Sequence, residues 1–261
     1  MARTTYGYTS THNRFWEIDL LRTFAIVMMI TFHTLYLLNY FDIQYTGVPG
    51  MRYEFWWWFP KLTGGTFIFL AGLSLTITYS RAKGMSGFML RGLKIFGYGM
   101  AITLITWLIS RTGYVRFGIL HFFGIAFILA PFFTRFRFIN LVLGIALMVA
   151  GIYLQEQRIL VDFPWLLWLG LMPRGFWTMD YWPLLPWFGL FLVGMFFGKV
   201  LYPQGNRRFN IHEFNNPVTS ALTFPGRHPL VIYLAQWPAV IGALLLLFPG
   251  NVLPYFPPFP F

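Results

Sequence analysis

The stretch RFWEIDLLRTFAIVMMITFH, residues 14–33, decides the fold, because it begins a membrane-spanning helix and yet carries Asp19, Arg22 and His33. At about 100° per residue, Arg22 and His33 lie within roughly 20° of one another around a helix, and Asp19 is on the same side. Four further residues share this face: Ile26, Met29, Tyr36 and Tyr40. Ionisable groups in hydrocarbon are costly unless they are paired or hydrated. We therefore expect a polar stripe that faces protein or a water-filled cavity and carries a functional site.

The composition around this stretch is that of an integral membrane protein. Of the 261 residues, 57% are hydrophobic and only 10% are charged, and the mean hydropathy is +0.60. A soluble domain carries about 25% charged residues. The net charge of +11 does not indicate a nucleic-acid partner, because the basic residues lie in short loops between apolar segments. That placement is typical of a topology signal and of contacts with anionic lipid.

The apolar segments predict an all-α membrane bundle of about seven transmembrane helices. Each segment is about as long as the 20 residues that a helix needs to cross a bilayer. The expected spans are 17–41, 62–80, 91–110, 117–134, 138–155, 183–201 and 226–248. Segment 163–172 is apolar but too short, so we expect a re-entrant or interfacial piece there. The predicted organisation is a cytoplasmic segment 1–15, a membrane domain 16–248 and a tail 249–261 rich in Pro and aromatic residues.

The distribution of Lys and Arg predicts the orientation of the bundle. Loop 81–94, segment 135–137, loop 199–215 and the N-terminus are basic, whereas acidic residues offset the charge of the alternate loops. The positive-inside rule then places the N-terminus in the cytoplasm and the C-terminus outside. We expect a multi-pass protein of the cell membrane, in contact with lipid.

This topology brings three polar residues to a similar depth in the outer half of the membrane. His33 lies late in the first span, His121 lies early in the fourth span, and Asp180 comes just before the sixth. A carboxylate that orients a histidine raises its basicity, which suits general-base catalysis. The alternative is structural: His121 bonds a backbone carbonyl and Asp180 caps the sixth helix. We expect His33, His121 and Asp180 to border one cavity.

A second group of cations lies toward the cytoplasm. Arginine side chains bind phosphate through two parallel hydrogen bonds. Arg22 lies about 16 Å from His33 along a helix, so a long ligand with an anionic head could place its other end at His33. The alternative is that these cations anchor the chain to lipid, and Arg22 is the exception because it lies well inside the first span. The candidate anion-binding residues are Arg22, Arg81, Lys83, Arg91 and Arg227.

Other chemistries find little support in the sequence. The chain has no Cys, which excludes disulfides, thiolate catalysis and iron–sulfur sites, and its five His are scattered. We therefore expect no metal. Gly72 and the Gly194-x-x-x-Gly198 pair are typical of close helix packing.

Five blocks of sequence resemble known membrane acyltransferases. The first span resembles the Arg…His motif of the acyltransferase-three group. More closely, the blocks resemble prokaryotic relatives of heparan-α-glucosaminide N-acetyltransferase, in order and over nearly the whole chain. The blocks are WEIDLLR (16–22) through His33, FIFLAGLSL (67–75), FGILH (117–121), DYWPLLPW (180–187) and GRHPLVIY (226–233).

This resemblance implies a membrane acyltransferase. The family takes acetyl-CoA from the cytoplasm and acylates an acceptor on the other side, and its catalytic histidine corresponds to His33. Two positions depart from the relatives: Thr23 replaces a usual glycine, and Gln236 replaces a usual histidine. The chain also lacks the lumenal domain of the eukaryotic enzyme, so the resemblance does not identify the acceptor.

The residues and the resemblance together favour an acyl-CoA-dependent acyltransferase that uses acetyl-CoA and no metal. His33 acts as the general base or briefly carries the acyl group, and Asp180 or His121 orients it or relays a proton. The acceptor is a hydroxyl or an amine, with a glycan as one candidate class. The sequence leaves open whether copies of the chain form a homo-oligomer. The rival interpretation is a transporter or channel for an anionic metabolite, and a third is a scaffold subunit, which the buried polar stripe disfavours.

Overall fold

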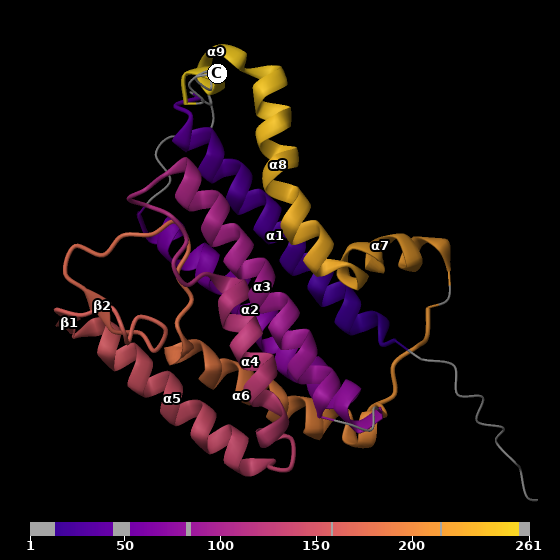
Figure 1. The fold of residues 1–261 in the computed structure, drawn as a ribbon. Helices are drawn as coiled ribbons and strands as arrows, with labels where there is room; N and C mark the ends of the chain where they lie inside the picture. Colours follow the sequence, from indigo (N-terminus) through magenta and orange to yellow (C-terminus); the bar gives the residue numbers. More distant parts are fainter. Residues whose placement is uncertain (1–13, 44–52, 82–84, 158, 215, 256–261) are drawn as a thin grey trace, which may run out of the picture. The chain divides into compact units, whose positions relative to one another are not determined.

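The computed structural model of the chain describes residues 14–43, 53–81, 85–157, 159–214 and 216–255, and it is helical almost throughout (Figure 1). Its α-helices are α1 (Trp16–Tyr40), α2 (Tyr53–Arg81), α3 (Ser86–Ile109), α4 (Ile119–Phe133), α5 (Phe138–Glu156), α6 (Leu184–Leu201), α7 (Pro217–Arg227), α8 (Pro229–Leu247) and α9 (Pro249–Val252). Two 3₁₀ turns, η1 (Pro203–Gly205) and η2 (Leu253–Tyr255), and two short parallel strands, β1 (Leu160–Val161) and β2 (Met172–Pro173), complete the described elements.

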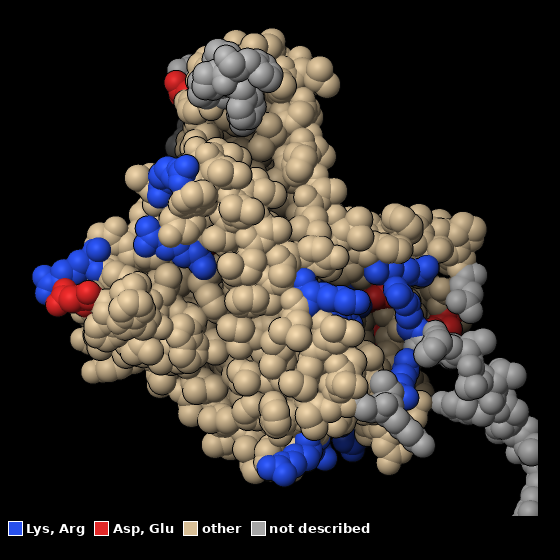
Figure 2. All heavy atoms as spheres, viewed as in Figure 1, with Lys and Arg blue, Asp and Glu red and all other residues tan. Residues whose placement is uncertain are grey.

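The membrane class predicted from the sequence is confirmed. Within the described residues, six helices are long and apolar enough to cross a membrane, and α4, with 15 residues, is a shorter apolar helix. These seven helices coincide with the seven predicted spans, so the chain is a multi-pass integral membrane protein. Most of the surface visible in Figure 2 belongs to residues other than Lys, Arg, Asp and Glu, as expected of a protein that faces lipid. The orientation of the bundle stays a prediction.

Segment 163–172 forms turns that lead from β1 into β2, and its re-entrant or interfacial placement stays a prediction. One local expectation needs revision. The last predicted span, 226–248, is divided: α7 ends at Arg227, and α8 begins at Pro229. The ring of Pro229 disfavours a helical conformation in the preceding residue, and His228 indeed has φ −126° and ψ 44°. Helix α7 itself was not predicted.

The chain forms two compact units. The terminal unit comprises residues 1–52 and 212–261 and includes α1, α7, α8 and α9. The central unit comprises residues 53–211 and includes α2 to α6.

In the terminal unit, α1 packs against α7 and α8, which return to it from the other end of the sequence. The stripe residues Ile26 and Met29 are buried, whereas Leu21, Phe24 and Val27 on the opposite side of α1 are at least half exposed. The predicted stripe therefore faces protein over its first half, whereas its last residue, Tyr40, is 45% exposed. Beyond it, the end of α1 is fixed by an apolar cluster of Leu37, Phe41, Ile43, Leu244 and Val252.

In the central unit, α6 packs against both α2 and α5, while α3 packs against α4. Glycines allow the α2–α6 contact to be close, as the sequence predicted. A Cβ atom on Gly72 would collide with the carbonyl oxygen of Phe191, and one on Gly194 would collide with that of Phe69. Such close backbone approach is typical of helix pairs that pack within membranes.

Candidate functional site

The polar stripe of α1 begins with a buried ion pair. The Asp19 carboxylate is 2.8 Å from the Arg22 guanidinium, and the Nε atom of Arg227 from α7 lies 4.0 Å from the other carboxylate oxygen. The side chain of Asp19 is only 4% exposed, whereas that of Arg22 is 23% exposed. The pairing of Arg22 with Asp19, one turn apart, is the arrangement that the sequence predicted. A buried carboxylate is thus compensated by two cations.

Helix α7 approaches the ion pair through its last turn. A Cβ atom on Gly226 would collide with the carbonyl oxygen of Asp19, so only glycine fits this close approach. The Gly226 N–H donates to the Thr23 hydroxyl at 2.9 Å, and that hydroxyl donates to the Asp19 carbonyl at 3.1 Å. Thr23 therefore joins α1 to α7, a contact that the glycine usual at this position in the relatives could not make.

His33 occupies the middle of the stripe and is held by α8. Its Nδ1 atom lies 2.7 Å from the side-chain amide nitrogen of Gln236. The ring centroids of Trp237 and Phe32 lie 5.3 and 5.6 Å from that of His33. Within the part of the chain that the structure describes, His33 makes no other hydrogen bond. One ring nitrogen is therefore anchored, and Nε2 is left for a ligand.

His121 is placed differently, at the start of α4 in the central unit. The Gly118 N–H donates to Nδ1 at 3.2 Å, and Nε2 lies 3.2 Å from the Thr103 hydroxyl, which donates to the Val115 carbonyl at 2.7 Å. A nitrogen that accepts an N–H bond carries no proton, so the neutral ring bears its proton on Nε2 and donates to Thr103. Both ring nitrogens of this buried residue, which is 1% exposed, are thus satisfied.

Asp180 joins His121 at the same helix end. One of its carboxylate oxygens accepts the Ile119 N–H at 2.9 Å, and the Trp182 side chain also bonds the carboxyl group. The first N–H groups of a helix lack partners within the helix. His121 and Asp180 satisfy two backbone N–H groups at the start of α4, and a Cβ on Gly118 would collide with Asp180. Asp180 therefore caps the fourth helix, not the sixth.

Burial of the Asp180 carboxyl group raises its pKa from 3.8 to about 6. The hydrogen bonds from Ile119 and Trp182 favour the charged form and oppose this rise without cancelling it. A carboxyl group with such a pKa changes charge close to neutral pH, which is a property of acid–base groups and also of buried structural carboxyls.

The predicted anion-binding residues are spread over both units. Arg22 and Arg227 surround Asp19 in the terminal unit. In the central unit, Arg81 donates to the Gly205 carbonyl at 2.6 Å, and the Arg91 guanidinium lies 5.1 Å from the centre of the Phe127 ring. Lys83 lies outside the described residues.

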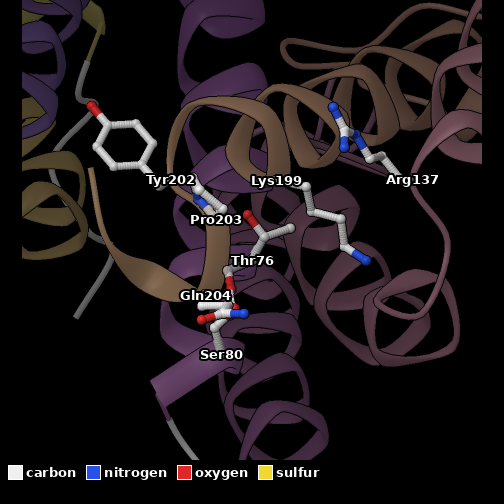
Figure 3. Close-up of a pocket in the computed structure, with 7 residues that line it drawn as sticks. All are labelled: Thr76, Ser80, Arg137, Lys199, Tyr202, Pro203 and Gln204. Atoms are coloured by element: carbon white, nitrogen blue, oxygen red, sulfur yellow. Dashed lines mark hydrogen bonds between the residues drawn. The ribbon is translucent and has the colours of Figure 1, made fainter. Parts of the chain in front are cut away.

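A hollow of about 460 Å³ opens where α2 and α6 end and α5 begins (Figure 3). Arg137 and Lys199 extend beside it, and their positive charges repel one another. Neither is paired with a carboxylate within the described ranges. Thr76, Ser80, Tyr202, Pro203 and Gln204 complete the lining. This chemistry suits an anion, and all three helix ends are on the predicted cytoplasmic side.

A family comparison agrees with the five sequence blocks. The model described as heparan-alpha-glucosaminide N-acetyltransferase, catalytic, matches residues 14–238, which is most of the chain. The chain belongs to this family. No curated protein and no solved structure matches it. The heparan-α-glucosaminide N-acetyltransferase family consists of membrane acetyltransferases with acetyl-CoA as donor, so the predicted family and enzyme class are confirmed at that level.

The structure brings some of the predicted site residues of this acetyltransferase-family chain together and separates others. His121 and Asp180 meet at the start of α4, whereas His33 belongs to the terminal unit, so a cavity shared by all three stays a prediction. In the described ranges, no group of three His, Cys, Asp or Glu side chains is arranged to hold a metal ion.

Sequence reasoning missed the partners of both histidines. Gln236 was noted only as a departure from the relatives, and nothing in the sequence indicates that it bonds His33. Thr103 carries no local motif that predicts its contact with His121. The signal for α7 was present, because Asn216-Pro217 pairs a favoured N-cap residue with proline at the first helical position.

Proposed function

We propose that this chain transfers an acetyl group from cytoplasmic acetyl-CoA to a hydroxyl or amine acceptor at the opposite face of the cell membrane, with His33 as the catalytic residue. The family supports the acetyl-CoA chemistry. The observation that carries the assignment of His33 is its asymmetric environment: Nδ1 is bonded to Gln236, and Nε2 has no hydrogen-bonding partner within the described residues.

His33 acts on the acceptor through Nε2. This nitrogen removes the proton of the acceptor hydroxyl or amine as the acceptor attacks the thioester carbonyl and forms the new C–O or C–N bond. The C–S bond breaks, and the proton on Nε2 passes to the leaving sulfur, which restores neutral His33 and gives the free thiol of coenzyme A. Transfer through an acyl group held briefly on Nε2 would use the same nitrogen and the same products.

Arginine and lysine side chains provide the charge that a phosphorylated donor needs. Arg22 and Arg227 line the start of α1, about 16 Å along the helix from His33. Arg81 and Arg91, with Lys83, are the candidates in the central unit. The hollow adds Arg137 and Lys199, two cations without a carboxylate partner among the described residues. We infer that these groups hold the phosphates of coenzyme A, because Arg and Lys pair strongly with phosphate.

His121 and Asp180 enter the proposal as groups that orient His33 or relay a proton. Their bonds to Gly118, Thr103 and Ile119 already account for both side chains without a substrate. We also propose that the acceptor is a glycan or an amine and that the chain forms a homo-oligomer. Both proposals can be tested with the same purified protein.

A turnover assay tests this function against transport. Purified protein in vesicles is given acetyl-CoA labelled in the acetyl group, together with a panel of amino sugars and simple amines on the other side. We expect free coenzyme A and a labelled product to form in equal amounts. A transporter or channel for an anionic metabolite, with the stripe of α1 lining its path, would instead give flux without thioester cleavage, and that result would overturn the proposal.

A further inference from the structure

We propose that Gln236 is the positioning residue of His33: its carboxamide stays bonded to Nδ1 in each protonation state of the ring and so keeps Nε2 directed at the acceptor. The inference rests on the proposed catalytic role of His33. It assigns to a residue of α8, 203 positions away in sequence, the hydrogen bond that holds the ring of the base on α1 in place.

The geometry of Gln236 is that of a built contact rather than a surface encounter. The residue is 5% exposed, and the 2.7 Å distance from its amide nitrogen to Nδ1 is short for an N–H···N bond. Its amide oxygen is buried and has no partner among the described residues. Buried polar atoms are nearly always paired, so an unpartnered one beside a candidate catalytic ring requires an explanation.

A carboxamide can bond Nδ1 in two ways. With its N–H₂ group toward the ring, it donates to a bare Nδ1, and the neutral ring carries its proton on Nε2. After rotation by 180°, its oxygen accepts from Nδ1–H, and the lone pair is then on Nε2. The second arrangement is the one a general base needs. It also suits the imidazolium that forms when Nε2 takes a proton, because both ring nitrogens then carry hydrogen.

Among the described residues, nothing donates to the amide oxygen in the orientation drawn, so no hydrogen bond there opposes rotation of the amide. The protonation state of His33 therefore decides which end faces Nδ1. A carboxylate at this position could only accept a hydrogen bond from Nδ1–H, and an apolar side chain could neither donate nor accept one.

The ring is also restrained by packing, so rotation of the amide changes the tautomer without moving Nε2. The centroid of the Trp237 ring lies 5.3 Å from that of His33 and 6.2 Å from that of Tyr36. The centroid of the Phe32 ring lies 5.6 Å from that of His33. A neutral amide further avoids placing a second charge within a membrane-spanning segment, where an ionised group is costly.

Two substitutions of Gln236 test this role. Gln236→Met keeps the length of the side chain and removes both hydrogen-bonding ends, so kcat should fall by about 10- to 100-fold while KM for acetyl-CoA stays within twofold. Gln236→Glu keeps an oxygen acceptor and adds a negative charge that stabilises the imidazolium. The acid limb of its kcat/KM profile should therefore move to higher pH by about one unit or more. Gln157→Met, at an exposed residue that ends α5, is the matched control and should leave both readouts unchanged.

Three outcomes separate this inference from the function on which it rests. If Gln236→Met turns over within threefold of the parent, or if Gln236→Glu leaves the acid limb in place, Gln236 is not the positioning residue of His33. If His33→Ala remains active, the proposed function fails first. If His33→Ala is inactive while both Gln236 variants behave as the parent, only the inference about Gln236 is wrong. Thermal melting of each variant shows whether it is folded, and the pH profile of Gln236→Glu decides the question even if Gln236→Met does not fold.

Discussion

The sequence assigned His33 and His121 to one candidate site, but the two units give their rings opposite hydrogen-bonding environments. His121, at the start of α4, has both ring nitrogens bonded to groups of the central unit. His33, in α1, has one nitrogen bonded to Gln236 and the other without a partner in the described residues. His121 is also the more deeply buried, at 1% exposed, whereas His33 is only partly buried. The ring nitrogen without a partner indicates that His33 is the histidine able to exchange a proton with a substrate.

The difference predicts opposite effects of truncating the two rings. His33→Ala should lower acetyl transfer by about 10²- to 10⁴-fold, the usual contribution of a general base, with melting behaviour near that of the parent. His121→Ala should primarily destabilise, by about 2 kcal/mol, because it leaves the Gly118 N–H without its partner and removes one of the two hydrogen bonds of the Thr103 hydroxyl. Initial rates and melting curves on the same preparations provide both readouts. A His121→Ala protein that melts normally and has lost its activity would show that His121 takes part in the reaction.

Loss of the ion pair at the start of α1 should have the next largest effect. Arg22→Leu should cost on the order of 3 kcal/mol, because the buried charge of Asp19 loses its hydrogen-bonded partner and keeps only the longer-range attraction of Arg14 and Arg227. Adding Asp19→Asn should restore most of that stability. Affinity for coenzyme A, measured by calorimetry, should remain low in the double variant if Arg22 also binds phosphate. Full recovery of affinity would limit Arg22 to a structural role, like that of the cap at α4.

The Asp180 carboxyl group gives the cap of α4 a pH dependence. Its pKa is raised from 3.8 to about 6, so the folded chain holds the proton more tightly than the unfolded chain. This contribution is fully present below about pH 4 and is lost as the pH rises to about 6, by up to about 3 kcal/mol. Melting temperature against pH should therefore show a downward component over that interval. Asp180→Asn should remove it, and an unchanged slope in that variant would assign the effect to another group.

The smallest expected effect concerns the hollow in Figure 3. Arg137→Gln combined with Lys199→Gln should raise KM for acetyl-CoA by about three- to tenfold, with kcat nearly constant, because exposed charge pairs contribute about 1 kcal/mol or less each. The effect should shrink at high salt. Lys61→Gln is the matched control, since Lys61 lies near the other end of α2, over Trp57. A loss of kcat instead of affinity would connect the hollow to the reaction itself.

Much of the fold follows directly from the sequence, because hydropathy and segment length are local properties. The seven spans, the buried face of α1 and the close α2–α6 contact were all predictable from residue type and spacing. The Asp19–Arg22 pair was also predictable, since its members are one helical turn apart.

The partners of the candidate site residues were not predictable in the same way. Gln236 and Thr103 contact histidines 203 and 18 positions away, and no periodicity within one helix encodes such contacts. Asp180 was expected at the start of the helix that follows it. Instead it caps α4, because the loop between α5 and α6 folds back and Tyr181 forms a bridge with Phe117.

The terminal unit also has a consequence for biogenesis. Domains and helices form in the order of synthesis, so α1 is made long before α7 and α8, the helices that complete its stripe. During that interval Arg22, one turn away, and Arg14 are the cations available to Asp19, whereas Arg227 and Gln236 are more than 200 residues from completion. A nascent or truncated chain that ends before α8 thus has the charge of Asp19 offset but lacks the Gln236 contact of His33. Under the proposed function, acetyl transfer can begin only when α8 has been inserted.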